Sequence, residues 1–164
     1  MQHLKRRLAE ARREDGFTLI ELAVVILIIG ILLAVAIPTF LGVRKNAQNK
    51  AAQSSVRNAL TAAKAYSSDS ASYSGLTPAL LGPETPELTV QLAASSAPKV
   101  ISMAVDGTFT LVLVARSQSG NCYYLRDNLD DTGTVASAQY AKLNNAVGTC
   151  ATGTPAAGDW KTSW

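Results

Sequence analysis

The chain reads Gly16-Phe17-Thr18-Leu19-Ile20-Glu21-Leu22 and runs directly into Ala23-Val24-Val25-Ile26-Leu27-Ile28. No residue from Leu22 to Val43 is charged, and roughly 20 apolar residues are enough to cross a bilayer as one helix. Glu21 therefore stands at the beginning of a membrane-length segment. A carboxylate there costs on the order of 3 kcal/mol without a partner, so the sequence predicts a functional counterion for Glu21.

The nearest counterion would be an amino group made by cleavage. If the chain is cut between Gly16 and Phe17, the new ammonium of Phe17 lies about one helical turn from Glu21, and it could meet the Glu21 carboxylate of a neighbouring chain. Wrong docking would then leave a buried unpaired charge, at a cost of about 3 to 5 kcal/mol. The alternative is that Glu21 lies at the headgroup level of a simple anchor and has no role.

These residues resemble the prepilin class of type IV pilins and pseudopilins. The match comprises a basic leader, Gly16 before the cut, Phe17 as first mature residue, Glu21 as the fifth and Pro38 near the end of the apolar run. The resemblance implies that a prepilin peptidase removes residues 1–16 and methylates the amine of Phe17. It also implies a filament of identical subunits that is built by a cytoplasmic ATPase and a membrane platform.

An ordinary secretory signal peptide is the competing interpretation. Residues 22–33 would form its apolar core and Ala34-Val35-Ala36 its cleavage site, so that Ile37 would be the first mature residue. A secreted binding domain or hydrolase would follow. An acidic residue at the start of the core and Pro38 just beyond the cut disfavour this interpretation.

The charge balance indicates no nucleic-acid partner. The net charge of the 164 residues is +3, and loss of the leader, with five basic and three acidic residues, leaves +1. The basic residues before the apolar run favour an N-terminus in the cytoplasm, with the remainder of the chain outside. We therefore expect a single-pass protein of the cytoplasmic membrane that later enters an extracellular pilus filament.

Small and apolar residues continue at helical spacing beyond the apolar run, from Phe40 to Tyr66. This period predicts one helix over residues 17–67, with a stem (17–43) that spans the membrane and then forms the filament core, and an amphipathic outer half (44–67). Pro38 should kink the helix. Gly30 adds backbone freedom and, with Ala34, allows helices to approach closely in lipid.

The remaining residues, 68–164, predict a small globular head. Serine, glycine and proline follow Tyr66, and three apolar runs at 99–105, 108–115 and 122–127, with a weaker one at 88–93, read as strands. Asp106-Gly107 predicts a hairpin. The expected fold class is α+β: a long N-terminal helix, part transmembrane stem and part amphipathic, packed on a small antiparallel β-sheet in a pilin-like lollipop.

Two cysteines, Cys122 and Cys150, lie in the part expected outside the cell. A disulfide is the economical interpretation, and free thiols or metal ligation is the alternative. The resemblance agrees with a disulfide, since many pilins close their C-terminal region in this way. The closed loop would contain residues 130–149, which we expect to be surface-exposed and variable.

The sequence predicts neither an enzyme nor a cofactor. The single histidine, His3, lies in the leader, and no phosphate-binding glycine loop is present. Asp127, Asp130 and Asp131 could gather around calcium, but their spacing misses the EF-hand pattern and a solvated turn is the simpler interpretation. Trp160 and Trp164 could form a contact patch, although packing of Trp160 on the sheet is the simpler alternative.

The favoured function is therefore a structural subunit of a type IV pilus. A pseudopilin of a type II secretion system, or a minor pilin, is the alternative within the same class.

Overall fold

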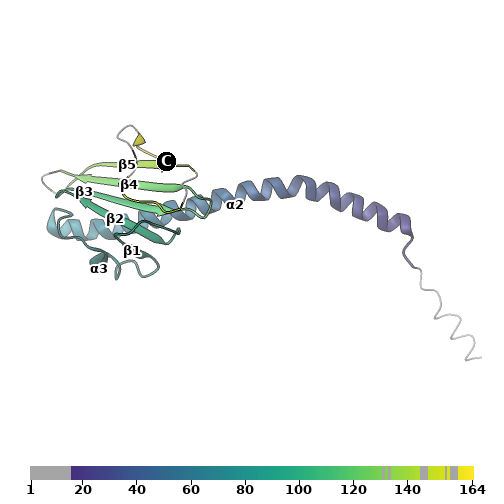
Figure 1. The fold of residues 1–164 in the computed structure, drawn as a ribbon, viewed down its shortest axis with the longest axis horizontal. Helices are drawn as coiled ribbons and strands as arrows, with labels where there is room; N and C mark the ends of the chain where they lie inside the picture. The colour runs from purple at the N-terminus through teal and green to yellow at the C-terminus, as the bar shows by residue number, and fades with distance from the viewer. Residues whose placement is uncertain (1–15, 131, 133, 145–147, 154, 156–158) are drawn as a thin grey trace, which may run out of the picture. The chain divides into compact units, whose positions relative to one another are not determined.

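The computed structural model describes residues 16–130, 132, 134–144, 148–153, 155 and 159–164. The chain divides into two compact units, Met1–Gly42 and Val43–Trp164. One helix, α2 (Leu19–Ser70), belongs to both (Figure 1). The predicted helix over 17–67 is thus confirmed, with its ends shifted by two and three residues. The leader, including His3, lies outside the described residues apart from Gly16.

The first unit consists, in its described part, of the non-helical residues 16–18 and the apolar first half of α2. Every described residue from Gly16 to Gly42 is exposed. Among the described helices, α2 alone is long and apolar enough to cross a membrane, and its most apolar window has a mean hydropathy of 3.1. A helix that is apolar on all sides needs lipid or other helices around it. The helix continues through Pro38, and the predicted kink stays a prediction.

The second unit packs the other half of α2 on a sheet. The buried face of the helix recurs every three or four residues, through Ala52, Ser55, Val56, Ala59, Leu60, Ala63 and Ser67. The alanines on this face leave room for the sheet to approach the helix backbone. The earlier part of the predicted stripe is not buried in this way, because Ala47 and Ala51 are exposed.

The sheet has five strands in the order β1-β2-β3-β4-β5. Their bounds are β1 (Thr89–Gln91), β2 (Val100–Asp106), β3 (Thr110–Arg116), β4 (Cys122–Leu129) and β5 (Val135–Leu143). Side chains alternate between its faces. Ile101, Leu113 and Leu125 join the core on the helix side, whereas Val114 and Tyr124 belong to a second cluster with the two cysteines.

The predicted hairpin is present. Asp106 pairs with Thr110, and Gly107 takes the positive φ of 66° that favours glycine in such a turn. The predicted strands at 99–105, 108–115 and 122–127 correspond to β2, β3 and β4, and the weaker one to β1. A short helix, α3 (Pro78–Leu81), lies in the stretch after Tyr66, where the sequence predicted no helix.

The sheet differs from the expected one in two details. The sheet is not purely antiparallel, because β1 runs parallel to β2. In addition, residues 135–143 of the 130–149 segment form a strand that the sequence did not predict, β5, which pairs along the whole of β4. The reason is that β4 would otherwise present an unpaired edge, and backbone groups need hydrogen-bond partners whatever the side chains are.

Asn49 fastens α2 to the turn between β3 and β4. Its Oδ1 atom accepts hydrogen bonds from Ser117 Oγ at 3.0 Å, Ser119 Oγ at 2.5 Å and Asn121 Nδ2 at 3.1 Å. These contacts span about 70 residues of sequence and set the position of the helix on the sheet.

Candidate assembly site

Glu21 is held within its own chain by Thr18. The backbone N–H and the hydroxyl of Thr18 both donate to Glu21 Oε2, at 2.8 and 2.7 Å, and the N–H of Glu21 donates to Thr18 Oγ1 at 3.2 Å. This reciprocal pair is a capping box, which satisfies backbone donors at a helix start. Thr18 had not been singled out in the sequence, although the Thr-x-x-Glu spacing is the signal that finds it.

The two oxygens of Glu21 are used unequally. Each described hydrogen bond to the carboxylate goes to Oε2, and none in the described part of the chain goes to Oε1. The capping box therefore leaves one carboxylate oxygen for a donor from another molecule, in an environment where every side chain around it is exposed.

The bond between Gly16 and Phe17 lies just before the helix. Both residues are exposed and neither is helical, and the side chain of Phe17 is 88% exposed. A Cβ atom added at Gly16 would meet nothing within 4 Å. No contact within the described chain therefore requires a glycine at this position.

A shallow apolar hollow surrounds Gly30. It measures about 640 Å³ and is lined by Ala23, Ile26, Leu27, Gly30, Ile31 and Ala34. A Cβ at Gly30 would also meet nothing within 4 Å, so no contact inside the described protomer requires this glycine. Small residues on an exposed apolar helix allow a second helix to approach closely. Eight positions further along, at Pro38, the helix lacks one backbone donor.

Cys122 and Cys150 form a disulfide, with 5.8 Å between their Cα atoms, which confirms the preferred interpretation of the two cysteines. Both are buried with Tyr124 and Val114 on the face of the sheet away from α2. Cys150 also exchanges two backbone hydrogen bonds of 2.8 Å with Ser95. The disulfide therefore links the C-terminal segment to β4, and the hydrogen bonds with Ser95 link it to the segment between β1 and β2.

The three aspartates considered for calcium do not share a described site. Asp127 is fully buried. Its Oδ2 accepts a 2.6 Å hydrogen bond from the hydroxyl of Tyr73, and Lys64 Nζ lies 3.4 Å from Oδ1. The solvated turn that we expected was therefore wrong for Asp127. Burial first, and the neighbouring Asp127 second, raise the pKa of Tyr73 above its usual range.

Asp130 instead accepts hydrogen bonds that stabilise the turn before β5. Its Oδ1 accepts from the hydroxyl of Thr132 at 2.6 Å and from the N–H groups of Thr132 and Thr134 at 2.9 and 2.8 Å. The Thr132 hydroxyl is the main cause that lowers the pKa of Asp130. Asp131 lies outside the described residues. Within the described part of the chain, no three metal-binding side chains come together.

The C-terminal tryptophans pack on the sheet. Trp160 meets Tyr124 edge-on at 6.5 Å between ring centroids, and the Arg126 guanidinium lies 4.4 Å from its ring. Trp164 donates its indole N–H to the carbonyl of Ala141 at 3.1 Å. The simpler interpretation of Trp160, packing rather than an outer patch, is therefore confirmed.

Comparison with known proteins agrees with the site at the helix start. Residues 11–37 match the family model of the prokaryotic N-terminal methylation motif. The chain is 42% identical over 62 residues to the type IV major pilin protein PilA of Myxococcus xanthus. These 62 residues represent 38% of this chain and 28% of that protein. No solved structure matches the chain.

A second relative is covered almost in full. The type IV wide pilus major component PilA4 of Thermus thermophilus is 34% identical over 113 residues, which represent 66% of this chain and 86% of that protein. The long helix followed by a mostly antiparallel sheet agrees with this similarity. The chain therefore belongs to the type IV pilin family.

Proposed function

We propose that this chain is the repeating structural subunit of a type IV pilus. The observation that carries the proposal is an apolar helix exposed on all sides, which begins with a carboxylate that has one oxygen unused by its own chain. Copies of such a helix form an open-ended helical fibre when each copy docks on the next by a rotation that does not close into a ring. Both relatives named above are described as major components of their pili, which favours a major subunit over a pseudopilin or minor pilin.

Maturation begins with removal of residues 1–16. A prepilin peptidase cuts after Gly16 and the amine of Phe17 is methylated. The match to the methylation motif supports this step, and so does the exposed, non-helical chain on both sides of the bond. The N-terminus lies in the cytoplasm and the second unit outside, with the stem in the membrane until assembly.

Assembly moves the stem from lipid into the fibre core. Lipid tails are as apolar as leucine, so this transfer gains little hydrophobic free energy. A cytoplasmic ATPase and a membrane platform therefore supply the work, as the family resemblance implies. Close packing of stems around Gly30 and Ala34, together with the kink that we expect at Pro38, then contributes van der Waals contact that lipid does not match.

The ammonium of Phe17 in one subunit pairs with Glu21 of its neighbour. Glu21 Oε2 stays bonded to Thr18, and Oε1 receives the ammonium. A subunit that docks in the wrong register leaves the charges apart in an apolar core, so the pair selects the correct register.

The test combines imaging, mass spectrometry and two variants. Negative-stain images of surface filaments should show long thin fibres, and their subunit should begin with a methylated Phe17. Glu21→Gln should still be cleaved but should give far fewer fibres, whereas Asp106→Asn, at an exposed carboxylate on the second unit, should assemble normally. An uncleaved subunit, or one that begins at Ile37, would refute the proposal; normal fibres from Glu21→Gln would refute the ion pair.

A further inference from the structure

Leu92 is an apolar side chain that the second unit holds out in solvent. The Leu92 side chain is 70% exposed. Among the described residues after Val43, Leu80 is the other large hydrophobic residue that is more than half exposed, at 51%. The turn that carries Leu92 is braced, since Gln91 Nε2 donates to the carbonyls of Ala93 and Ala94 at 3.3 and 3.1 Å. The exposure of Leu92 is thus built into an ordered turn.

The base of this turn is also anchored. Ser95 is buried, and its hydroxyl accepts from the N–H of Arg116 at 2.9 Å. Its backbone pairs with Cys150, which is linked to Cys122. These contacts hold the turn at a fixed place on the second unit, so the Leu92 side chain is available to insert into a partner.

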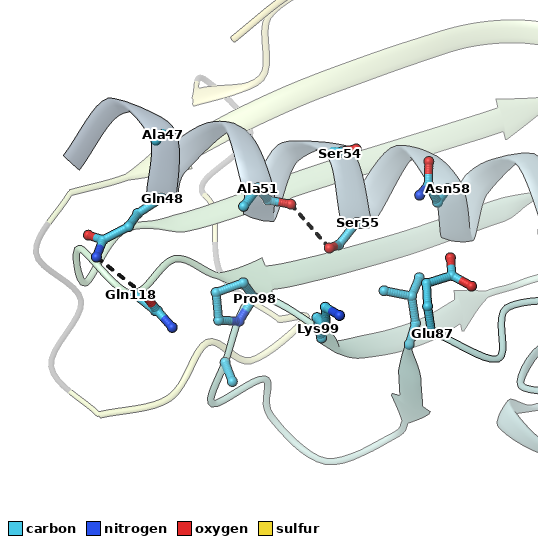
Figure 2. Close-up of a pocket in the computed structure, with 12 residues that line it drawn as sticks. Ala47, Gln48, Ala51, Ser54, Ser55, Asn58, Glu87, Pro98, Lys99 and Gln118 are labelled. Carbon is cyan, nitrogen blue, oxygen red and sulfur yellow. Dashed lines mark hydrogen bonds between the residues drawn. The ribbon is translucent and has the colours of Figure 1, made fainter. Parts of the chain in front are cut away.

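A groove of matching character lies along α2 in the same unit (Figure 2). It measures about 710 Å³, with Ala47, Ala51 and Ser54 on the helix side and Leu88 and Pro98 on the other. The hydrogen bond from Gln48 Nε2 to Gln118 Oε1, 3.3 Å long, crosses one end of it. Glu87 and Lys99 also line the groove, and their opposite charges cancel.

The topology separates Leu92 from the groove of its own subunit. Because β1 and β2 are parallel, the chain must run back along β1 between residues 92 and 99. Leu92 follows the last residue of β1, whereas Leu88 and Lys99 stand at the strand's beginning, next to the paired Thr89 and Val100. The three-residue strand is about 10 Å long, so a leucine at one end does not fill a groove at the other.

Charge segregation favours a second copy of this chain as the occupant. Residues 22–68 contain Arg44, Lys45, Lys50, Arg57 and Lys64 and no acidic residue. Residues 69–98 contain no basic residue, and Asp69 and Glu84 carry their negative charge outside the groove, since Glu87 lines the groove and is offset there by Lys99. The segment that carries Leu92 is therefore acidic, and the helix that lines the groove is basic, so two copies attract each other in this orientation.

We propose that Leu92 of one subunit inserts into the groove between α2 and the start of β1 of the next subunit. The contact joins two different surfaces, so it leaves a Leu92 and a groove open at the two ends and propagates along a fibre. It rests on the proposed function, because it is a contact of the assembled pilus. It assigns a second recognition surface, separate from the stem, to the second unit.

The test uses the full chain expressed in cells that assemble its fibres. A photo-reactive benzophenone amino acid at position 92 should crosslink, in purified fibres, to residues 47–58 or 87–99 of another subunit. The same group at position 80 is the matched control and should not. Leu92→Gln should lower fibre yield roughly tenfold, since a central apolar anchor commonly accounts for that much affinity. Leu80→Gln should leave the yield unchanged.

The groove is tested from its other side. Ala51→Leu places a larger side chain in the groove and should lower fibre yield, whereas Thr61→Leu, exposed on α2 but outside the groove, should not. Equal subunit levels in the membrane exclude misfolding. Wild-type fibres whose position-92 crosslinks fall outside the groove, or are absent, would overturn the contact alone. No wild-type fibres at all would overturn the proposed function and this contact with it.

Discussion

Tyr73→Phe is expected to destabilise the second unit by about 2 kcal/mol, because it removes a hydrogen bond to a buried charge. Tyr73 and Asp127 are both fully buried, and the hydroxyl lies 2.6 Å from Oδ2. Hydrogen bonds to charged groups contribute roughly 1.5 to 3 kcal/mol. The remaining partner, Lys64, has a side chain that is 36% exposed and lies 3.4 Å away, so solvent screening prevents it from replacing the lost bond.

The assay is urea unfolding of the full chain in detergent, followed by tryptophan fluorescence. Both tryptophans, Trp160 and Trp164, lie in the second unit, so the signal reports this unit and not the stem. Tyr66→Phe is the matched control: its hydroxyl donates to the carbonyl of Ser74 at 2.9 Å in an exposed position, and its loss should cost under about 1 kcal/mol.

The pH dependence gives an independent check. The pKa of Tyr73 is raised in the folded chain by burial and by Asp127, while an unfolded tyrosine titrates near pH 10. Its stabilising contribution is therefore complete below about pH 10 and is lost as the pH rises toward the raised value, by about 1.4 kcal/mol per pH unit. The difference between wild type and Tyr73→Phe should shrink above pH 10. A loss no larger than that of Tyr66→Phe, or a difference constant up to pH 11, would refute the reasoning.

Three further predictions concern contacts at other places. Asn49→Ala should lower the free energy of unfolding by about 1 to 2 kcal/mol, because three donors lose one acceptor; urea titration measures it, and an unchanged midpoint would contradict it. The double variant Cys122→Ser/Cys150→Ser should lose about 3.5 kcal/mol of stability, because its unfolded chain is no longer closed by a bond between residues 28 positions apart. An equal loss in the reduced wild type is the check. Thr18→Val should destabilise the helix start by about 1 kcal/mol, whereas Thr18→Ser should cost almost nothing. Amide exchange in the first turn of α2 should therefore be faster in Thr18→Val than in Thr18→Ser. Equal exchange rates in the two variants would argue against the capping box.

Much of the fold could be predicted because its signals are local. The apolar run fixes the helix, and alternating β-branched residues around Asp106-Gly107 fix β2 and β3. β5 was missed because Ala136, Ala138 and Gln139 have low strand propensity, and the strand forms through pairing with β4. Tertiary pairing overrides propensity in such a case, and one sequence does not display it.

Asp127 shows the same limit at a single residue. In the sequence it stands close to Asp130 and Asp131, and three acidic residues in five suggest an exposed turn. In the fold it belongs to β4, pairs with Leu111 and faces α2. Its partners, Lys64 and Tyr73, are more than 50 residues earlier in the chain, so no local pattern indicates that a buried aspartate has them.

The capping box changes the energetics of the proposed ion pair. The estimate from sequence assumed a carboxylate with no partner, but Glu21 Oε2 already accepts two hydrogen bonds from Thr18. In a misdocked subunit the Glu21 carboxylate would thus keep its two hydrogen bonds from Thr18. The larger share of the free-energy cost of the unpaired charges would come from the Phe17 ammonium. Glu21→Gln separates the two contributions, because an amide oxygen can still accept from Thr18 but does not neutralise an ammonium. If the capping box alone mattered, that variant would assemble; we expect failure, because a charge in an apolar core needs a counter-charge and not merely a dipole.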